Sequence, residues 1–495
     1  MRPAGADARQ PAPSPAPRGR GLRFLPLAFA AACIIAAAAH AQIRNVVMIV
    51  ADDQRTDTVA AWGNEHIDTP NLDALTARGT SFTNAYCMGS MTPAVCAPSR
   101  AMFLSGRTLL NLGPNPYDTQ PDVRLLPEVL RDSGVTTFAT GKWHNGKASF
   151  ARAFDGGASI FFGGMGSHTD LLVHDFDPAG DYPNNARRTL REFSSAEFAS
   201  AAVEFLRSDE AATPFFLYLS FTAPHDPRTP PDEDSSRYRA DPPPLPANFL
   251  PLHPFDNGEM TIRDEALAAW PRTEADIQHH LADYYAMITH MDRQIGRVLK
   301  AIAAAGRTDD TLVVFFADHG LAVGSHGLLG KQNLYEHSTK APLIVAGPGI
   351  AEGVSTPAPV YLLDIPATVC DLLGFETAWC PESESFAPAL QGQTFGGRPS
   401  ILTLYRDSQR AVRQGDWKLI RYPRINHTQL FNLASDPDEL HNLAEDPAQT
   451  DRMISLLGEL GRWQERIGDE PPLSADPALP MHFDHADAER NRRGG

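Results

Sequence analysis

A cysteine at the start of a short polar motif is the residue in this sequence best placed to do chemistry. Cys96 opens the string CAPSR, which continues as AMFLSGR. Pro98 followed by helix-forming residues predicts a helix start, because proline is favoured in the first helical turn. Free backbone N–H groups and the helix dipole at such an end favour an anion. Arg100 lies one turn along and has a planar guanidinium suited to a tetrahedral oxyanion. The motif therefore predicts an anion site beside Cys96.

Polar side chains recur just after apolar runs that predict buried strands. The four runs are residues 43–50, 214–221, 311–316 and 343–346. Continuous apolar runs are typical of strands covered on both faces, and the carboxyl ends of such strands are where open α/β sheets bind ligands. The polar residues that follow the first three runs are Asp52, Asp53, His225, Asp318 and His319. We therefore expect these side chains to share one site.

The elements that position this site predict an α/β domain. Apolar residues at helical spacing across residues 281–302 indicate a helix between two strands, and strands alternating with helices favour a largely parallel sheet. We assign residues 42–395 to the catalytic domain and residues 396–467 to a smaller α+β subdomain. The Pro- and Asp-rich residues 227–254 indicate a long surface loop, and the polar tail 468–495 is expected to be poorly ordered.

The N-terminus has the order of an export signal. Three arginines precede an apolar run at residues 24–39, and the small-x-small string at residues 39–41 resembles a signal-peptidase site. We therefore predict a signal peptide over residues 1–41 and an exported, periplasmic or secreted protein. The run is too short for a stable membrane anchor. A buried helix of the folded domain and a lipoprotein anchor at Cys33 are the alternatives.

Composition excludes one class of partner. The 495 residues are 42% hydrophobic and 21% charged, as in ordinary globular proteins, and the net charge is −17. No basic stripe occurs beyond the first 23 residues, so we expect no nucleic-acid binding. The acidic total repels anions at long range, so an anion site must be a local cluster of cationic side chains.

Four cysteines follow the predicted signal peptide, and an exported protein can form disulfides between them. Cys370 and Cys380 are close in sequence and could pair. Cys87 and Cys96 are also close, so a Cys87–Cys96 disulfide is the structural alternative to a reactive Cys96.

The motif at Cys96 resembles that of the formylglycine-dependent sulfatases. Their C-x-P-S-R cysteine is oxidised to formylglycine, and L-x-G-R, here residues 104–107, completes the family motif. The resemblance extends from about Asn45 to Leu443. It implies an alkaline-phosphatase-like fold, with a mixed, largely parallel sheet flanked by helices and a smaller C-terminal subdomain. It also implies a formylglycine-generating enzyme or an anaerobic maturase as a partner.

The resemblance also implies a metal site with one Ca²⁺ per chain. Two pairs of residues match the family's ligands, and the modified cysteine completes the set. The residues concerned are Asp52, Asp53, Cys96, Asp318 and His319. Carboxylate ligands with one softer group favour a hard cation over Zn²⁺. A turn or a helix cap is the alternative role of the first pair.

The catalytic residues implied by the resemblance surround the same motif. Lys142 and His144 lie in a G-K-x-H string: Lys142 would contact the sulfate, and His144 would be the base that completes turnover. His225 would hold the sulfate or protonate the leaving oxygen. Lys331 and Arg100 would neutralise the charge of the sulfate. An isolated lysine is by default a solvated surface charge.

Three further residues could shape the substrate pocket. His326 and Asn333 flank Lys331 in sequence, and His168 follows a Gly-rich segment of a kind often found near active sites. The strings at residues 317–331 and 225–228 resemble bacterial carbohydrate sulfatases. A sulfated small molecule or oligosaccharide is therefore the expected substrate.

Three other functions are alternatives. A phosphonate monoester hydrolase or phosphodiesterase of the same superfamily would share the modified cysteine. A dizinc phosphatase would need further His and Asp ligands in place of Lys142 and Lys331. A catalytically silent carbohydrate-binding relative would keep Cys96 as a thiol or pair it with Cys87.

Overall fold

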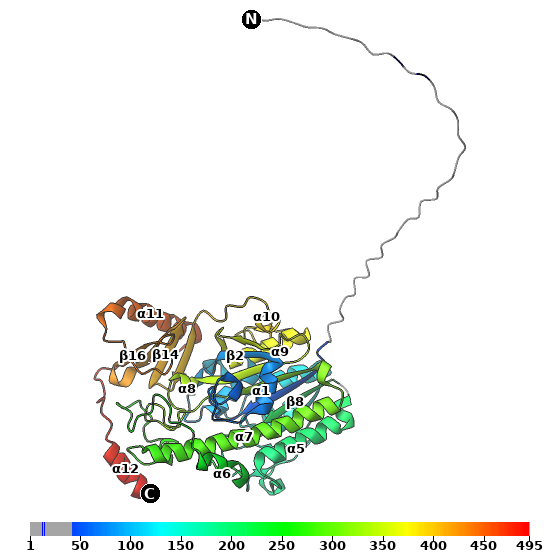
Figure 1. The fold of residues 1–495 in the computed structure, drawn as a ribbon, viewed down its shortest axis with the longest axis horizontal. Coiled ribbons are helices and arrows are strands. Elements are labelled where there is room, and N and C mark those ends of the chain that lie inside the picture. Colours follow the sequence, from blue (N-terminus) through cyan, green and yellow to red (C-terminus); the bar gives the residue numbers. More distant parts are fainter. Residues whose placement is uncertain (1–11, 13, 15–41, 213, 495) are drawn as a thin grey trace. The chain divides into compact units, whose positions relative to one another are not determined.

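A computed structural model describes residues 12, 14, 42–212 and 214–494 (Figure 1). The predicted signal peptide, residues 1–41, lies outside the described part of the chain except at two positions. Among the described residues, no helix combines the length and apolar character needed to cross a membrane.

The main sheet has nine strands in the order β11-β2-β10-β9-β1-β8-β4-β5, with β12 also paired to β2. Five neighbouring strands run parallel: β9 (Thr311–Ala317), β1 (Asn45–Ala51), β8 (Phe215–Ser220), β4 (Thr136–Lys142) and β5 (Gly156–Phe161). The strand β10 (Lys340–Ala346) is antiparallel to β9 and to β2 (Gly79–Tyr86). Two short strands run parallel to β2: β11 (Val354–Thr356) and β12 (Val360–Tyr361). Every residue of β1, β8 and β9 is buried, which explains their continuous apolar sequences. The predicted mixed, largely parallel sheet is confirmed.

Helices cover this sheet on both sides. Figure 1 shows α5 (Ser194–Arg207), α6 (Asp232–Ala240) and α7 (Glu274–Ala304) on one side, and α9 (Ile365–Leu373) and α10 (Ala387–Leu390) on the other. The remaining helices of the catalytic part are α1 (Pro70–Ala77), α2 (Cys96–Ser105), α3 (Leu126–Asp132), α4 (Lys147–Ala153) and α8 (Glu336–Thr339). The helix predicted across residues 281–302 is the core of α7. It begins after Thr273, whose hydroxyl accepts a hydrogen bond from the Asp276 N–H at 3.1 Å.

The segment predicted as a long surface loop, residues 227–254, contains the helix α6. Acidic residues in the first turn of α6 and arginines in its last turn complement the helix dipole. Asp234 of α6 is buried and pairs with Arg293 of α7, with Nη2 and Oδ2 2.7 Å apart. The loop prediction was wrong there because it rested on proline and aspartate content, and α6 is stabilised by charge contacts with α7.

A second sheet is formed by four strands that follow the main sheet in sequence and by one short strand from the segment before Cys96. Its strands are β16 (His427–Asn432), β15 (Trp417–Tyr422), β14 (Gln409–Gln414), β13 (Ile401–Tyr405) and β3 (Gly89–Ser90), and α11 (Thr450–Ile467) packs against β14 and β15. The short strand β3 precedes Cys96 and pairs with β13, so this sheet helps to position the Cys96 segment. The residues from His40 to Gly495 form one compact unit, and a domain boundary at residue 396 stays a prediction.

The C-terminal tail, residues 468–495, was expected to be poorly ordered and instead makes specific contacts. Asp469 and Arg410 are both 1% exposed at the side chain and form a buried ion pair, with Oδ2 and Nε 2.6 Å apart. Further along, the tail ends in α12 (His485–Gly494). A polar composition did not reveal these tertiary contacts.

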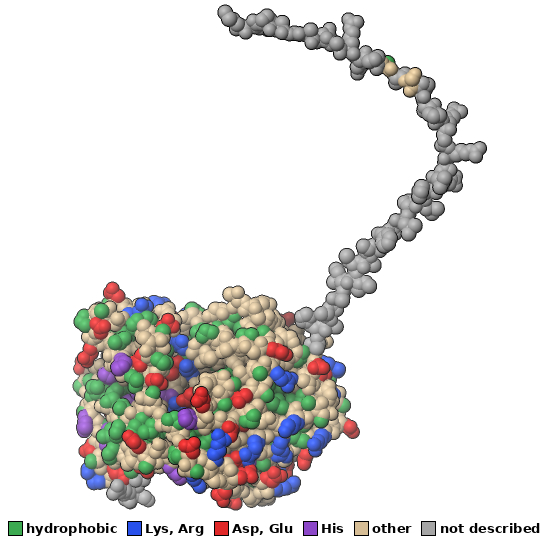
Figure 2. All heavy atoms as spheres, viewed as in Figure 1, with side chains coloured by type: hydrophobic (Ala, Val, Ile, Leu, Met, Phe, Trp, Pro, Cys, Tyr) green, Lys and Arg blue, Asp and Glu red, His purple; other side chains and the backbone are tan. Residues whose placement is uncertain are grey.

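The surface carries mixed charge. Acidic and basic side chains are interspersed over the face that shows α5 and α7 in Figure 2.

Candidate active site

The carboxyl edge of the main sheet brings the predicted polar residues together. Asp52 and Asp53 follow β1, and Asp318 and His319 follow the neighbouring strand β9. All four side chains are at most 1% exposed. Cys96 is the first residue of α2, as the proline in its first turn predicts, and is 2% exposed. The structure therefore brings the polar residues after β1 and β9 together with Cys96, and their role as one functional site stays a prediction.

Four of these side chains form a set that could hold a cation. One ligand atom from each lies within 4.8 Å of the others, and the four residues are Asp52, Cys96, Asp318 and His319. The His319 ring contacts the Gly320 carbonyl oxygen through Nδ1 at 2.8 Å. A carbonyl only accepts, so Nδ1 carries a proton and Nε2 faces the cluster. Burial would lower the pKa of His319, but the carboxylates of Asp318 and Asp53 raise it to about 9, so Nε2 would give up its proton to bind a cation.

Two buried atoms of this cluster have no hydrogen-bond partner, namely Asp52 Oδ1 and His319 Nε2. Buried polar atoms are normally satisfied, so two atoms of one cluster without a hydrogen-bond partner leave room for a further ligand there, such as a cation. Asp53 Oδ1 lies 3.2 Å from His319 Nε2 and can complete the set. Three carboxylates and one imidazole fit a hard divalent cation.

Three buried cationic groups face the three carboxylates. Lys142 Nζ lies 2.5 Å from Asp52 Oδ2, and Lys331 Nζ lies 2.8 Å from both oxygens of Asp53. Burial alone would lower the pKa of each lysine, but the adjacent carboxylates outweigh it and raise the pKa above its usual value. Both lysines are therefore charged, and together with Arg100 they neutralise the carboxylates before any divalent ion binds.

Arg100 does not point into the cavity beside Cys96. Its Nε donates to Asp318 Oδ2 at 3.1 Å and its Nη1 donates to the Ser220 hydroxyl at 2.6 Å, with the guanidinium fully buried. A direct role of Arg100 in neutralising the charge of the sulfate stays a prediction. The position of Arg100 one turn into α2 places the guanidinium beneath the sheet edge, where it orients a carboxylate.

His144 contacts the cysteine directly. Its Nδ1 lies 3.3 Å from Cys96 Sγ. Burial would raise the pKa of the Cys96 thiol, but the charges of Lys142, His144 and Lys331 hold that pKa well below its usual range. The residue is thus in an electropositive setting, of the kind that stabilises negative charge at its side chain.

The backbone around His144 is unusual. His144 itself has φ 64° and Asp53 has φ 70°, in the left-handed region that costs non-glycine residues energy. Gly164 packs against the His144 ring: a Cβ there would lie 2.7 Å from Nε2. Strain of this kind persists where the surrounding structure requires a fixed side-chain direction.

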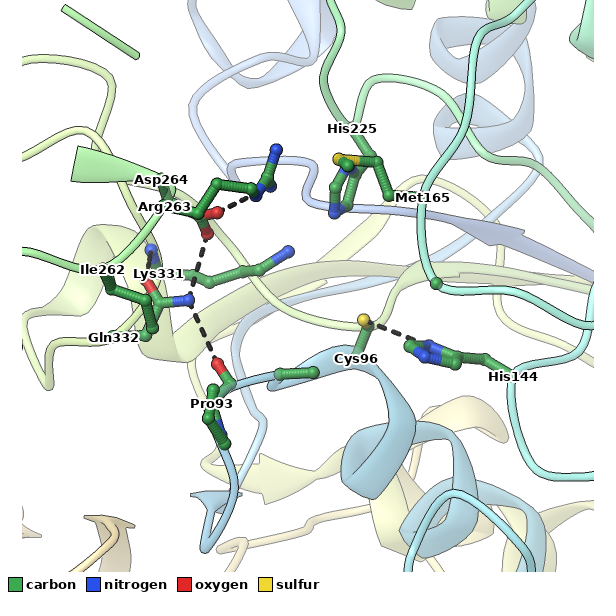
Figure 3. Close-up of a pocket in the computed structure, with 12 residues that line it drawn as sticks. Pro93, Cys96, His144, Met165, His225, Ile262, Arg263, Asp264, Lys331 and Gln332 are labelled. Atoms are coloured by element: carbon green, nitrogen blue, oxygen red, sulfur yellow. Dashed lines mark hydrogen bonds and ion pairs between the residues drawn. The ribbon is translucent and has the colours of Figure 1, made fainter. Parts of the chain in front are cut away.

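A cavity of about 230 Å³ opens above Cys96, and Figure 3 shows the side chains of Cys96, His225 and Lys331 directed into it. His225 follows β8, and its Nδ1 lies 2.7 Å from the Asp226 carbonyl oxygen. Because a carbonyl only accepts, Nδ1 carries the proton and Nε2 faces the site. The cavity is lined by Pro93, Ala94, Cys96, His144, Gly164, Met165, His225, Ile262, Arg263, Asp264, Lys331 and Gln332.

The three predicted pocket residues lie elsewhere. His168 is buried behind His225, with Nε2 3.0 Å from the His225 carbonyl oxygen, and burial lowers its pKa to about 4. His326 stacks on Tyr335 at 3.9 Å between ring centroids. Asn333 donates to the Gly330 carbonyl oxygen at 3.2 Å. All three support the chain around the site and do not line the cavity.

Sequence reasoning missed one wall of the cavity. Ile262, Arg263 and Asp264 come from a segment between α6 and α7, and Gln332 follows the predicted Lys331. The segment has no motif and no regular periodicity, so only the adjacency of Gln332 to Lys331 could have pointed to it.

The cysteines carry free thiols. Cys87, Cys96, Cys370 and Cys380 are all buried and unpaired in the structure. Neither of the two pairings that the sequence leaves open, Cys370–Cys380 and Cys87–Cys96, is formed. Burial raises the pKa of Cys87 to about 12, which is the opposite of the shift at Cys96.

Comparisons with known proteins agree with this geometry. The family model named Sulfatase matches residues 44–375, and the model of the C-terminal part of N-sulphoglucosamine sulphohydrolase matches residues 324–466. A choline-sulfatase of Rhizobium meliloti is 28% identical over 444 residues, which cover 81% of this chain and 83% of that protein.

Two solved structures share the fold. A protein in complex with its substrate D-glucosamine-2-N,6-O-disulfate has a TM-score of 0.75 at 21% identity, covering 87% of this chain and 99% of that one. A phosphonate monoester hydrolase of Agrobacterium radiobacter has a TM-score of 0.67 at 20% identity, covering 89% and 100%. With the Cys96 motif, the cation cluster and the family match over more than half of its length, the chain belongs to the sulfatase family and is a sulfuric ester hydrolase with an alkaline-phosphatase-like fold.

Proposed function

We propose that this enzyme hydrolyses sulfate esters of a carbohydrate with a formylglycine made from Cys96 and one bound Ca²⁺. The observation that carries the proposal is the position of Cys96, in contact with His144 and within the cation cluster, at the floor of the cavity. A buried thiol kept for packing would need none of these neighbours.

Ca²⁺ would be held by residues from three segments, namely Asp52 and Asp53 after β1, Asp318 and His319 after β9, and the modified Cys96. Bound there, the ion supplies positive charge that polarises the sulfate group. The negative charges of the three aspartates are already balanced by the positive charges of Lys142, Lys331 and Arg100. A bound divalent ion would therefore give the site a net positive charge. That local charge opposes the −17 of the whole chain and favours a sulfate ester.

Formylglycine in its hydrated form supplies one hydroxyl that attacks sulfur and a second whose deprotonation allows sulfate to leave. The remaining steps belong to other side chains. Lys331 lines the cavity and binds the sulfate oxygens, and Lys142 stabilises negative charge at residue 96. His225 turns Nε2 to the cavity, and in its doubly protonated form the Nε2–H can give a proton to the leaving oxygen.

The proposal includes export of the protein and enzymatic maturation of Cys96. The order of charged, apolar and small residues before residue 42 supports export to the periplasm or beyond. Maturation is proposed to precede folding, because Cys96 is only 2% exposed in the folded state. A formylglycine-generating enzyme or an anaerobic maturase would then act on the Cys96 motif in the unfolded chain.

A carbohydrate is favoured as the leaving alcohol by the shape of the cavity and by the relatives. The volume of about 230 Å³ lies below the roughly 300–1,000 Å³ of pockets for drug-sized ligands, so it suits one sugar residue. Apolar side chains of Pro93, Ile262 and Met165 can cover a ring face, while polar groups stand between them. The glucosamine disulfate bound by a structural neighbour supports the same class.

A phosphonate monoester hydrolase is the second candidate, favoured by the structural likeness to the Agrobacterium radiobacter enzyme. Parallel kinetics on 4-nitrophenyl sulfate and 4-nitrophenyl phenylphosphonate decide between them. The proposal requires a higher kcat/KM for the sulfate ester. A higher value for the phosphonate ester would replace the proposed function with this one.

The modification is tested by mass spectrometry. Protein from a host that makes formylglycine should give a Cys96 peptide lighter than the unmodified thiol peptide, and this peptide should react with hydrazides. Protein from a host without the maturation enzyme provides the matched control with an intact thiol. A fully active enzyme that retains the thiol at Cys96 would disprove the mechanism.

His144→Ala is expected to separate the two products in time. His144 contacts residue 96, so we assign it to the proton transfer that lets sulfate leave, after the alcohol has gone. With an activated aryl sulfate, the variant should release about one equivalent of alcohol per site and then stop, with sulfate release lost. Rapid-quench measurement of both products checks this. His225→Ala is the comparison and should slow alcohol release itself, least for esters with good leaving groups. Absence of the alcohol burst in His144→Ala would contradict the assignment.

A further inference from the structure

One wall of the cavity carries an arginine fixed between two carboxylates. Arg263 Nη2 donates to Asp226 Oδ1 at 3.0 Å and to Asp264 Oδ1 at 2.6 Å, and Nη1 donates to Asp226 Oδ2. The arginine side chain is 43% exposed, whereas both aspartates are 7% exposed. The guanidinium is therefore held from behind and open towards the cavity, where Figure 3 shows it near His225.

The second carboxylate is fixed as well. Asp264 Oδ2 accepts from Gln332 Nε2 at 3.0 Å, and the same amide donates to the Pro93 carbonyl oxygen at 3.2 Å. Figure 3 shows this chain of contacts running along the cavity wall. An arginine and an aspartate held side by side in this way need no reordering when a ligand binds.

The charge of this wall disfavours a second anion. Arg263, Asp226 and Asp264 together carry one net negative charge, and a protonated His225, with Nδ1 3.4 Å from Asp226 Oδ1, can at most cancel it. Burial would raise the pKa of Asp226, but hydrogen bonds from Arg263 and the charge of His225 hold that pKa well below its usual range. Lys331, which also lines the cavity, pairs with Asp53 and is assigned to the reacting sulfate, so it is not available to a second anion. A ligand group at Arg263 and Asp264 is therefore better neutral than anionic.

The donors and acceptors that remain match hydroxyl groups. A guanidinium has five N–H donors, and the contacts of Arg263 with the two aspartates use three, so two stay available. Each Asp264 oxygen accepts one hydrogen bond here and has a further lone pair. Adjacent hydroxyls of a sugar both donate and accept, and so can satisfy the two residues together.

We infer that Arg263 and Asp264 bind a pair of neutral hydroxyl groups on the sugar that carries the sulfate, so that the enzyme prefers a sugar monosulfate to a substrate with a second sulfate or a carboxylate. The inference rests on the proposed function and names its substrate class. Arg263 and Asp264 act in specificity, because the chemistry takes place at residue 96 across the cavity.

The test compares kcat/KM for four probes: a methyl N-acetylglucosaminide 6-sulfate, the same sugar with a second sulfate, choline sulfate and 4-nitrophenyl sulfate. The wild-type enzyme should prefer the monosulfated sugar to the disulfated one by about 10-fold or more. If 6-sulfation of that sugar is not accepted, the same comparison is made with galactose 6-sulfate, galactose 4-sulfate and their disulfated forms, and the preferred sugar is used with the variants.

Arg263→Gln and Asp264→Asn should each lower kcat/KM for the sugar monosulfate by roughly 10- to 100-fold, mainly through KM, because each removes charged hydrogen bonds to a hydroxyl. The ratio of kcat/KM for the sugar monosulfate to kcat/KM for 4-nitrophenyl sulfate should also fall in both variants, because the aryl ester has no hydroxyl groups for these residues to bind. Asp264→Asn removes one negative charge and should therefore also lower the ratio of kcat/KM for the monosulfated sugar to kcat/KM for the disulfated sugar. Arg462→Gln on α11 is the matched control, because its side chain is 60% exposed and pairs only with Glu459. Thermal unfolding of each variant verifies that it folds.

Three outcomes would overturn the inference: a wild-type preference for the disulfated sugar, a preference for choline sulfate, or equal losses on sugar and aryl esters in both variants. Failure of the proposed function gives a different result: the wild-type enzyme carrying formylglycine would hydrolyse none of the sulfated sugars, or would have a higher kcat/KM for 4-nitrophenyl phenylphosphonate than for 4-nitrophenyl sulfate. A preference for choline sulfate would overturn both the inference and the carbohydrate part of the proposed function.

Discussion

Cys96→Ala is expected to abolish turnover while the protein remains folded. If the formylglycine made from Cys96 is the nucleophile, alanine removes the reacting group, and loss of a nucleophile costs on the order of 10⁴- to 10⁶-fold in kcat. The cysteine side chain is small and lies at the cavity floor, so its truncation should cost little stability. Sulfate release measured with an aryl sulfate, together with thermal unfolding, checks both halves of the prediction.

Cys87→Ala is the matched control for this result. Cys87 is also buried, 3% exposed, and also lies close before α2, but it does not line the cavity. Its thiol pKa is raised to about 12, so it has no thiolate character at neutral pH. We expect this variant to keep its activity. A Cys96→Ala enzyme within about 10-fold of wild type would contradict the nucleophile assignment, whatever the control shows.

The sequence allowed the sheet edge to be predicted because burial on both faces leaves a strong pattern. Strands such as β1 and β9 are apolar throughout, so the first polar residues after them mark the carboxyl edge. The same logic placed His225 after β8. The position of Cys96 at a helix start was predicted for a different reason, because a proline in the first helical turn is a local signal. The motif itself was identified by its resemblance to the formylglycine-dependent sulfatases.

The directions of side chains and their contacts with distant segments could not be predicted from the sequence pattern. Arg100 was placed correctly on α2, but its contacts with Asp318 and Ser220 come from strands far away in the sequence. His168 was identified by its Gly-rich neighbourhood, yet both of its ring nitrogens are used in buried contacts. Composition and spacing predict where a residue lies along an element, and the packing of distant elements decides what it touches.

The segment that carries Arg263 shows why one wall of the pocket was missed. The segment has no periodic pattern because it is held by particular contacts. Glu265 accepts hydrogen bonds from the backbone N–H groups of Leu329 and Gly330, and Arg272 pairs with the same carboxylate. Loops of this kind vary in sequence and conformation more than the strands that support them, and substrate specificity is commonly built there.

Asp318→Asn is expected to lose both the bound cation and most of the activity. The amide has one neutral oxygen in place of the carboxylate, in a cluster where two other buried polar atoms, Asp52 Oδ1 and His319 Nε2, have no hydrogen-bond partner. Metal-ion stabilisation of developing charge contributes several kcal/mol, so we expect kcat/KM to fall on the order of 10³-fold. Arg100 would also lose its nearest carboxylate inside the protein, at a cost of roughly 3–5 kcal/mol in the free energy of unfolding.

Elemental analysis separates these two effects of Asp318→Asn. The wild-type protein should contain about one calcium per chain, lose activity on exhaustive chelation and regain it with Ca²⁺, whereas the variant should contain none and not recover. Asp364→Asn is the matched control: this carboxylate is 1% exposed and pairs with Arg398 away from the cavity, so its loss should reduce stability but leave the calcium content intact. Unchanged wild-type activity after complete chelation, or two zinc ions per chain, would contradict the metal assignment. Loss of calcium in both variants would instead attribute the effect to unfolding, because Asp364 has no place in the cation cluster.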